Sequence, residues 1–275
     1  PNAMRGYLYL NQADGTFLEA AEECGLRGTG GGTGLVFADF DRDGDQDLVL
    51  AGIGWNRLGG IGGDPLRAFE NDGEGHFTEV TDQAGMGGPM PALGLVAADF
   101  DGDGHLDLFV AGYGRMEVAR NDNWIQATNG APDRLLLGLG GLAFRDGTKD
   151  AGLHDRDWTA SALAADLDQD GDMDLVTLNH FGVNRFWRNQ GGGTFERDDE
   201  AFGSSEARLT FGGTLGDFDQ DGFLDLYLAG ASSGTGRRMF SRMESSGNGD
   251  VSHSLRGLAQ GLSLIHISEP TRRTP

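Results

Sequence analysis

A nine-residue acidic segment occurs four times in this sequence, and its spacing constrains the fold more than any other feature. The segment has the form D-x-D-x-D-G-x-x-D, and its copies begin at Asp39, Asp99, Asp166 and Asp217. Successive copies start 60, 67 and 51 residues apart. A repeat of this period indicates a chain built from similar units that stack side by side.

Each acidic segment lies between two short apolar runs. GLVFADF (34–40) and DLVLAG (47–52) flank the first copy. The later copies are flanked by GLVAADF and DLFVAG, by ALAADL and DLVTLN, and by TLGDF and DLYLAG. Runs of this length bounded by turn residues are typical of β-strands, so we expect each acidic segment to connect the strands of a hairpin.

A second hairpin pattern follows the first in each unit. The segments 69–86 and 186–203 contain a strand-like run, a glycine-rich turn, a Phe that opens the next strand, and a closing glycine. Segment 8–26 has the same shape, and 135–153 is a looser version. Two hairpins in about 60 residues match one blade of a β-propeller, whereas solenoid repeats are usually shorter. The 48 glycines and 7 prolines agree with many short strands joined by tight turns.

The expected fold is therefore an all-β propeller of four-stranded blades. We place a half-blade at 7–26 and four blades at about 34–90, 93–153, 160–204 and 210–261. The half-blade duplicates a hairpin that the last blade already has, which favours a part of a larger ring. Residues 262–273, LSLIHISEPTRR, match no part of the repeat and resemble the translation of a sequencing-library adapter. We expect residues 1–261 to form the repeat domain and 262–275 to be a non-native or disordered tail.

The acidic segments have the composition of calcium loops. Ca²⁺ takes about 6 to 8 oxygen ligands, so its sites need several carboxylates on a sharply curved backbone. Positions 1, 3, 5 and 9 supply carboxylates, the glycine at position 6 permits the turn, and position 7 offers its carbonyl. We predict about four calcium ions. Their ligands are Asp39, Asp41, Asp43, Asp45 and Asp47; Asp99, Asp101, Asp103, His105 and Asp107; Asp166, Asp168, Asp170, Asp172 and Asp174; and Asp217, Asp219, Asp221, Phe223 and Asp225.

The EF-hand is the main competing interpretation because its loop also begins D-x-D-x-D-G. An EF-hand requires a bidentate Glu at position 12 and a following helix. Position 12 is occupied here by Leu50, Val110, Thr177 and Leu228, all in predicted strands. These residues exclude an EF-hand. Mg²⁺ is disfavoured because it prefers a stiff octahedron and keeps several waters.

The net charge of −22 disfavours two other classes of partner. An acidic surface repels phosphate backbones and anionic lipid headgroups, so neither nucleic acid nor a membrane surface is expected to bind. No apolar run approaches the roughly 18 residues of a transmembrane segment. Cys24 is the single cysteine, so a disulfide framework and a cysteine-based zinc site are both excluded, and we expect it to be buried.

The acidic hairpins resemble a known family. DFDRDGDQDLVLAG, DFDGDGHLDLFVAG, DLDQDGDMDLVTLN and DFDQDGFLDLYLAG are similar to the FG-GAP/VCBS repeats of integrin α-subunit propellers and bacterial surface proteins. NRFWRNQGGGTF (184–195) resembles the bacterial and cartilage-acidic-protein branch of that family. The resemblance covers about residues 7–261. It implies a propeller, commonly of seven blades, with calcium between the first two strands of a blade, in a secreted or cell-surface protein.

Two functional classes remain open from the sequence. The first is a calcium-binding adhesion or binding module that presents loops to a protein or carbohydrate ligand. The second is a domain of a secreted carbohydrate-active enzyme, such as a polysaccharide lyase or hydrolase. The sequence shows no paired metal-binding histidines, nucleophile elbow or phosphate loop, which favours the first class. Trp55 and Trp124 lie in predicted loops and are candidates for the ligand surface, whereas Trp158 and Trp187 lie in predicted strands and should be core residues.

Overall fold

The computed structural model describes residues 6–29, 32–54, 62–114, 127–198, 200–201 and 210–230, and the backbone of 252–255 and 262–263. This part of the chain contains one two-stranded sheet and four four-stranded sheets. Two helices of four residues each are the only helices within it. The prediction of an all-β fold is therefore confirmed.

The sheets follow the predicted repeat units in chain order. The two-stranded sheet contains β1 (Tyr9–Asn11) and β2 (Phe17–Glu19). The first complete sheet contains β3 (Gly34–Ala38), β4 (Asp47–Ala51), β5 (Arg67–Asn71) and β6 (Phe77–Glu79). The second contains β7 (Ala92–Ala98), β8 (Asp107–Gly112), β9 (Arg134–Gly138) and β10 (Phe144–Asp146). The third contains β11 (Thr159–Ala165), β12 (Asp174–Asn179), β13 (Arg185–Asn189) and β14 (Phe195–Arg197).

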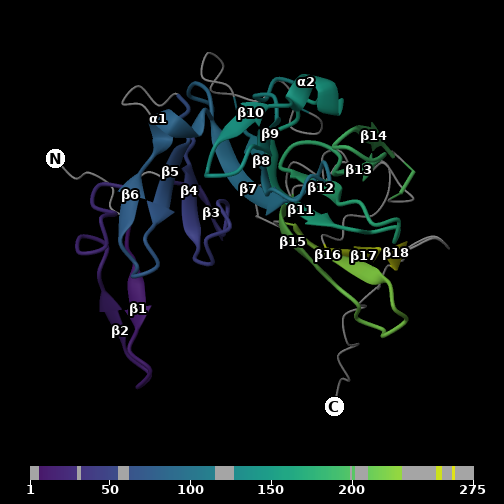
Figure 1. The fold of residues 1–275 in the computed structure, drawn as a ribbon. Helices are drawn as coiled ribbons and strands as arrows, with labels where there is room; N and C mark the ends of the chain where they lie inside the picture. The colour runs from purple at the N-terminus through teal and green to yellow at the C-terminus, as the bar shows by residue number, and fades with distance from the viewer. Residues whose placement is uncertain are drawn as a thin grey trace, which may run out of the picture.

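These three sheets are antiparallel meanders, in which each strand pairs with the next one in sequence. The first strands of successive sheets, β3, β7, β11 and β15 (Thr210–Gly216), lie next to one another. Figure 1 shows the sheets arranged side by side along an arc, with the β1–β2 hairpin at one end and β15 to β18 at the other. This arrangement is that of propeller blades, and the described sheets form an open arc.

The core consists of layers between the sheets, because residues alternate between the two faces of each strand. On β4, Val49 packs toward the second sheet, whereas Leu48 packs with Ala21 and Leu26, which follow the β1–β2 hairpin. On β8, Val110 faces the first sheet and Phe109 faces the third. The second and third sheets are therefore stabilised by both neighbours, as expected for stacked repeats.

Three of the sequence predictions about buried side chains can be checked. Trp158 and Trp187 are each 4% exposed, which confirms that they are core residues. Cys24 is buried, as predicted. Trp55 and Trp124 lie outside the described residues.

The short helices connect one sheet to the next. They are α1 (Thr81–Ala84), after β6, and α2 (Thr148–Ala151), after β10. The hydroxyl oxygens of Thr81 and Thr148 accept hydrogen bonds from the backbone amides of Ala68 and Leu135, at 3.1 and 3.0 Å. Each helix is thereby tied to the third strand of its own sheet.

The last sheet differs from the predicted blade at 210–261. It contains β15, β16 (Leu224–Gly230), β17 (Ser252–Leu255) and β18 (Leu262–Ser263). β17 pairs antiparallel with Leu226–Ala229, and β18 pairs parallel with Leu224 and Asp225. Two short strands therefore share one edge of β16, and the predicted second hairpin is not found in the described part of this sheet. The first two residues of the proposed tail form β18, and the assignment of the tail remains a prediction.

We expect Trp187→Ala to destabilise the protein by about 3 to 5 kcal/mol, because the truncation leaves a cavity between the second and third sheets. Trp187→Phe should cost less, since much of the ring contact is kept. Urea unfolding at constant calcium would measure both changes. A loss below about 1 kcal/mol for the alanine variant would contradict the assignment of this residue to a close-packed layer.

Candidate metal centres

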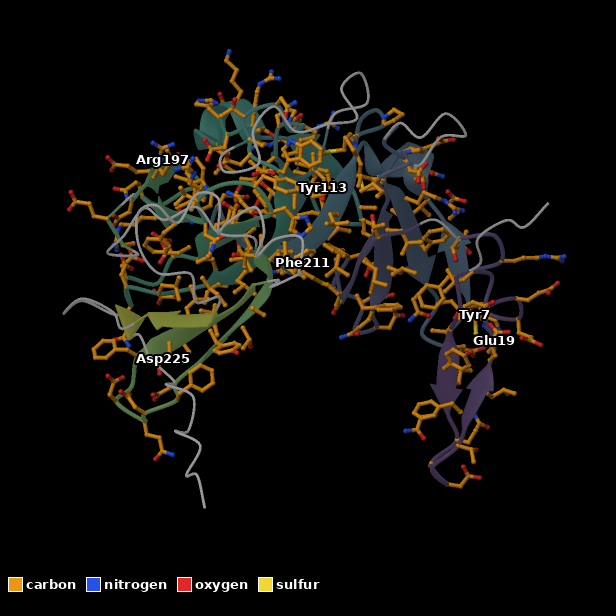
Figure 2. All side chains as sticks on the ribbon, turned by 180° about the vertical axis from the view of Figure 1, so that it is seen from behind. Tyr7, Glu19, Tyr113, Arg197, Phe211 and Asp225 are labelled. Carbon is orange, nitrogen blue, oxygen red and sulfur yellow. The ribbon has the colours of Figure 1, made fainter. Side chains whose placement is uncertain are left out.

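The four acidic segments form the connections between the first and second strands of their sheets. The segments starting at Asp39, Asp99, Asp166 and Asp217 are called loops 1 to 4 below. They join β3 to β4, β7 to β8, β11 to β12 and β15 to β16. Asp225, labelled in Figure 2, lies in β16 where loop 4 ends. The sequence therefore repeats one hairpin connection four times along the arc.

The turn in each loop depends on two residues with positive φ. The position-6 glycines have φ of 100°, 90°, 100° and 92°, in Gly44, Gly104, Gly171 and Gly222. Position 4 also has positive φ, between 61° and 74°, although Arg or Gln occupies it in three of the loops. A side chain at positive φ is disfavoured, and the surrounding loop must hold it there.

Backbone amides in each loop donate to its carboxylates. The position-7 amide donates to the position-5 carboxylate in all four loops, at 2.8 to 3.1 Å. In loops 2 to 4 the position-6 glycine amide donates to position 1, with Gly104 to Asp99 at 2.9 Å as an example. These bonds curve the backbone around the acidic side chains.

Each loop brings three of its predicted ligands together. The oxygens of each group lie within 4.8 Å of one another. The groups are Asp39, Asp41 and Asp43; Asp99, Asp101 and Asp107; Asp166, Asp168 and Asp174; and Asp217, Asp219 and Asp225. The remaining carboxylates, Asp47, Asp103, Asp170 and Asp221, are not part of these groups. The ligand role of the position-7 carbonyls stays a prediction.

The position-9 aspartate connects each loop to its sheet. In loop 2, Asp107 Oδ2 accepts a hydrogen bond from the Phe100 amide and Asp107 Oδ1 accepts one from Gly138, both at 2.8 Å. Gly138 is the last residue of the third strand, β9. Loops 1 and 3 repeat this arrangement with Asn71 and Asn189 as the third-strand donors. One buried carboxylate thus joins three segments of the sheet.

Loop 4 makes only half of this connection. Asp225 Oδ2 accepts a hydrogen bond from Phe218 at 2.8 Å. Asp225 Oδ1 is buried and has no hydrogen-bond partner among the described residues. In loops 1 to 3 the second donor lies two residues beyond the partner of the leucine that follows the aspartate. Leu226 pairs with Leu255, so the equivalent residue in the last sheet is 257, which lies outside the described part of the chain.

Burial raises the pKa of the position-9 aspartate in loops 1 to 3. Desolvation raises the pKa of Asp47, Asp107 and Asp174 to about 6, although their backbone hydrogen bonds act in the opposite direction. These carboxylates are costly to keep ionised in the absence of a cation. Such a cost is expected where a positively charged ligand belongs.

The chemistry of the loops fits a hard cation. Asp39 Oδ1 and Asp45 Oδ1 are buried without a hydrogen-bond partner in the described part of the chain. Asp39 is a predicted carboxylate ligand, and Asp45 is the position-7 residue whose carbonyl is predicted to bind. Unpaired buried oxygens are expensive unless a cation or water contacts them. Every converging ligand in the four loops is a carboxylate, which suits Ca²⁺ rather than a softer metal.

Neighbouring loops are also joined by side chains at position 4. The Arg42 guanidinium of loop 1 donates to the carbonyl of Gly104 in loop 2. The Gln169 amide of loop 3 donates to the carbonyl of Gly222 in loop 4, at 2.9 Å. Loop 2 has Gly102 at position 4, so no side chain reaches from it. The sequence interpretation missed these contacts, although position 4 could have been compared across the repeats.

A fifth group of possible ligands was not predicted. Asp72, Glu74 and His76 lie in the exposed turn between β5 and β6 and offer three atoms within 4.8 Å. Asp72 Oδ1 accepts hydrogen bonds from the amides of Glu74 and His76, which accounts for the shape of the turn. The D-x-E-x-H pattern is visible in the sequence but occurs once.

The stacked four-stranded sheets, each with an acidic loop between its first two strands, define a propeller-type repeat protein with carboxylate-rich candidate metal loops. The chain belongs to the FG-GAP-like repeat family, whose repeat matches residues 2–50, 54–110, 99–177 and 166–228. The resemblance stated from the acidic hairpins is thereby confirmed.

The chain is also similar to curated relatives named cartilage acidic protein 1. It is 34% identical to the Xenopus tropicalis protein over 107 residues, which cover 38% of this chain and 15% of that protein. It is 28% identical to the Homo sapiens protein over 180 residues, which cover 63% of this chain and 24% of the relative. The chain thus spans about a quarter or less of the length of these relatives.

In the described residues, no helix is long and apolar enough to cross a membrane.

We expect Asp107→Asn to destabilise the calcium-free protein by about 1 to 3 kcal/mol, because an amide cannot accept both backbone hydrogen bonds. Asp103→Asn is the matched control. Its side chain accepts one bond, from His105, and an amide oxygen can preserve that bond. Denaturant unfolding in a chelator would compare the two. Equal losses would mean that the position-9 carboxylate has no special structural role.

The pKa shifts also predict a pH dependence of the calcium-free protein. Asp47, Asp107 and Asp174 have folded pKa values of about 6 against 3.8 for the ordinary group, so the folded state takes up protons first as the pH falls. Protonation of these three groups therefore increases the stability of the folded state as the pH falls from 7 to 5. Burial lowers the pKa of His180 to about 4, which opposes the rise because the unfolded state then takes up the imidazole proton first.

Three groups outweigh one, so we expect the melting temperature in chelator to increase from pH 7 to pH 5. His180→Gln should make the increase steeper, because it removes the opposing group and its amide can still bond the Tyr113 hydroxyl. If the melting temperature fell from pH 7 to pH 5 in both the wild type and His180→Gln, the raised pKa values assigned to the three buried aspartates would be contradicted.

Proposed function

We propose that this chain is a calcium-binding propeller module that acts outside the cell or at its surface in binding or adhesion. One observation carries the proposal. Four loops in equivalent positions each gather three carboxylates with oxygens within 4.8 Å. A single acidic turn is common without a metal, but four copies at the same point of a structural repeat support a shared ligand.

The residues of each loop have separate tasks in this proposal. The carboxylates at positions 1, 3, 5 and 9 and the carbonyl at position 7 would hold the ion, which supplies positive charge and a cross-link between the strands. The glycine at position 6 sets the curvature, and its amide orients position 1 in loops 2 to 4. The position-9 carboxylate already joins loop and sheet in loops 1 to 3, so an ion held there would stiffen the whole blade.

The proposed location follows from calcium supply and charge. Loops of this kind in extracellular modules bind calcium at about 10⁻⁴ to 10⁻³ M, which only extracellular calcium would saturate. The net charge of −22 suits a soluble surface that avoids nucleic acid. We propose a protein or carbohydrate ligand on the loop faces of the blades, since connecting loops on a rigid scaffold usually carry binding residues.

Equilibrium dialysis followed by metal analysis should find about four calcium ions per chain at saturation. Each site should stabilise the fold by about 2.7 kcal/mol at a hundredfold excess of calcium over the dissociation constant. Asp101→Asn combined with Asp103→Asn should reduce the calcium-induced rise in melting temperature, because loop 2 then loses two ligand charges.

Glu22→Gln combined with Glu23→Gln is the matched control, since it removes two charges from exposed positions outside the acidic loops. It should preserve the full shift. One bound ion or none at saturating calcium would reject the proposal, and equal shifts in both double variants would reject loop 2 as a site.

A further inference from the structure

The third strand of each complete sheet places one side chain beside the end of the acidic loop. Leu48, Leu108 and Leu175 follow the position-9 aspartates and pair with Phe69, Leu136 and Trp187. The next residue on the third strand therefore lies opposite the position-9 aspartate. That residue is Glu70 in the first sheet, Leu137 in the second and Arg188 in the third. The three loops thus share one backbone design but have an anionic, a neutral and a cationic neighbour.

Arg188 contacts the loop directly. Its Nη1 forms an ion pair with Oδ2 of Asp168, the position-3 carboxylate of loop 3. Its Nη2 lies 3.2 Å from Oδ2 of Asp198, which follows β14. Asp168 is only 14% exposed, so this pair is partly shielded from solvent. The guanidinium also lies 5.3 Å from the centre of the Phe186 ring, which helps to hold the side chain over the loop.

We propose that Arg188 is a built-in counter-ion of loop 3 and makes this loop the weakest calcium site of the first three. The inference rests on the proposed calcium function and assigns an order to its sites. In the calcium-free protein the guanidinium offsets the negative charge of Asp168. Calcium needs the same carboxylate, so it must displace Arg188 or bind beside its positive charge.

The first sheet has the opposite arrangement. Glu70 is exposed at the strand position that Arg188 occupies in the third sheet, so the residue opposite Asp47 is anionic. Leu137 in the second sheet is buried and contributes no charge. At this strand position only loop 3 has a cation, so loop 3 should bind calcium more weakly than loops 1 and 2. Arg42 also lies beside loop 2, but it bonds the Gly104 carbonyl rather than a ligand carboxylate. A unit charge within about 4 to 6 Å changes proton affinity by tenfold or more, and a divalent ion should respond at least as strongly.

The test uses the full chain and calcium alone as the probe. Isothermal titration should resolve a weak class of sites in the wild type, which Asp170→Asn removes because that residue is a predicted ligand of loop 3. Arg188→Leu should strengthen this class by about tenfold or more. Arg145→Leu is the matched control: it removes one positive charge from an exposed position on β10 and should leave the isotherm unchanged.

Glu70→Arg is the reciprocal variant. It alters an exposed residue, so it tests the inference even if Arg188→Leu does not fold. It should weaken one tight site by about tenfold. A calcium-free measurement gives a separate readout, since Arg188→Leu should lower the melting temperature in chelator by exposing the repulsion among Asp166, Asp168 and Asp174.

The outcomes separate the two proposals. Stronger binding in Arg188→Leu together with weaker binding in Glu70→Arg supports the counter-ion role. If Arg188 only stabilised the fold, Arg188→Leu would lower the melting temperature without raising calcium affinity. Isotherms identical to the wild type in both variants would overturn the inference and leave the calcium function intact. No calcium binding by the wild type would overturn both.

Discussion

A buried aspartate at the ninth position of the acidic loop is the interaction on which the rest of each complete blade depends. In loops 1 to 3 this carboxylate accepts one backbone amide from the loop and one from the third strand. The same group is therefore a hairpin cross-link and a candidate metal ligand. Because the carboxylate is buried, its charged form is costly unless hydrogen bonds and a cation stabilise it. The candidate metal site and the fold therefore share one side chain.

Charge at the loops is balanced by several means along the arc. Backbone amides neutralise part of it in every loop, and Arg188 does so in loop 3. Arg42 and Gln169 bond the carbonyls of the following loops, so some neighbouring loops support one another. The apolar layers between the sheets supply the remaining stabilisation, because the second and third sheets bury both faces against their neighbours. Calcium would act on a scaffold that packing has already assembled.

The four acidic loops share one backbone conformation, but the residues around them differ from one sheet to the next. The glycine at position 6 and the carboxylate at position 9 are present in all four loops, since the turn and the strand connection need them. Position 4 and the third-strand neighbour vary, and those positions decide contacts between loops and the charge beside each site. For Asp225, the described residues supply the loop amide of Phe218, and the residue equivalent to the third-strand donors lies outside the described part of the chain. Identical motifs therefore need not be identical sites.

The acidic segments and their flanking apolar runs were sufficient to predict the all-β class and the strand pairs, because alternation and turn chemistry are local properties. Of the four carboxylates predicted to converge in each loop, three do so in the described structure. Tertiary structure decided which residues act together across larger distances. The Asn71, Gly138 and Asn189 amides meet the position-9 carboxylates only when the third strand pairs, and Arg188 meets Asp168 only in that register. The pairing of β17 and β18 at the edge of β16 was likewise decided by the tertiary structure, because pairing at an open sheet edge depends on which strand reaches it and not on the local sequence.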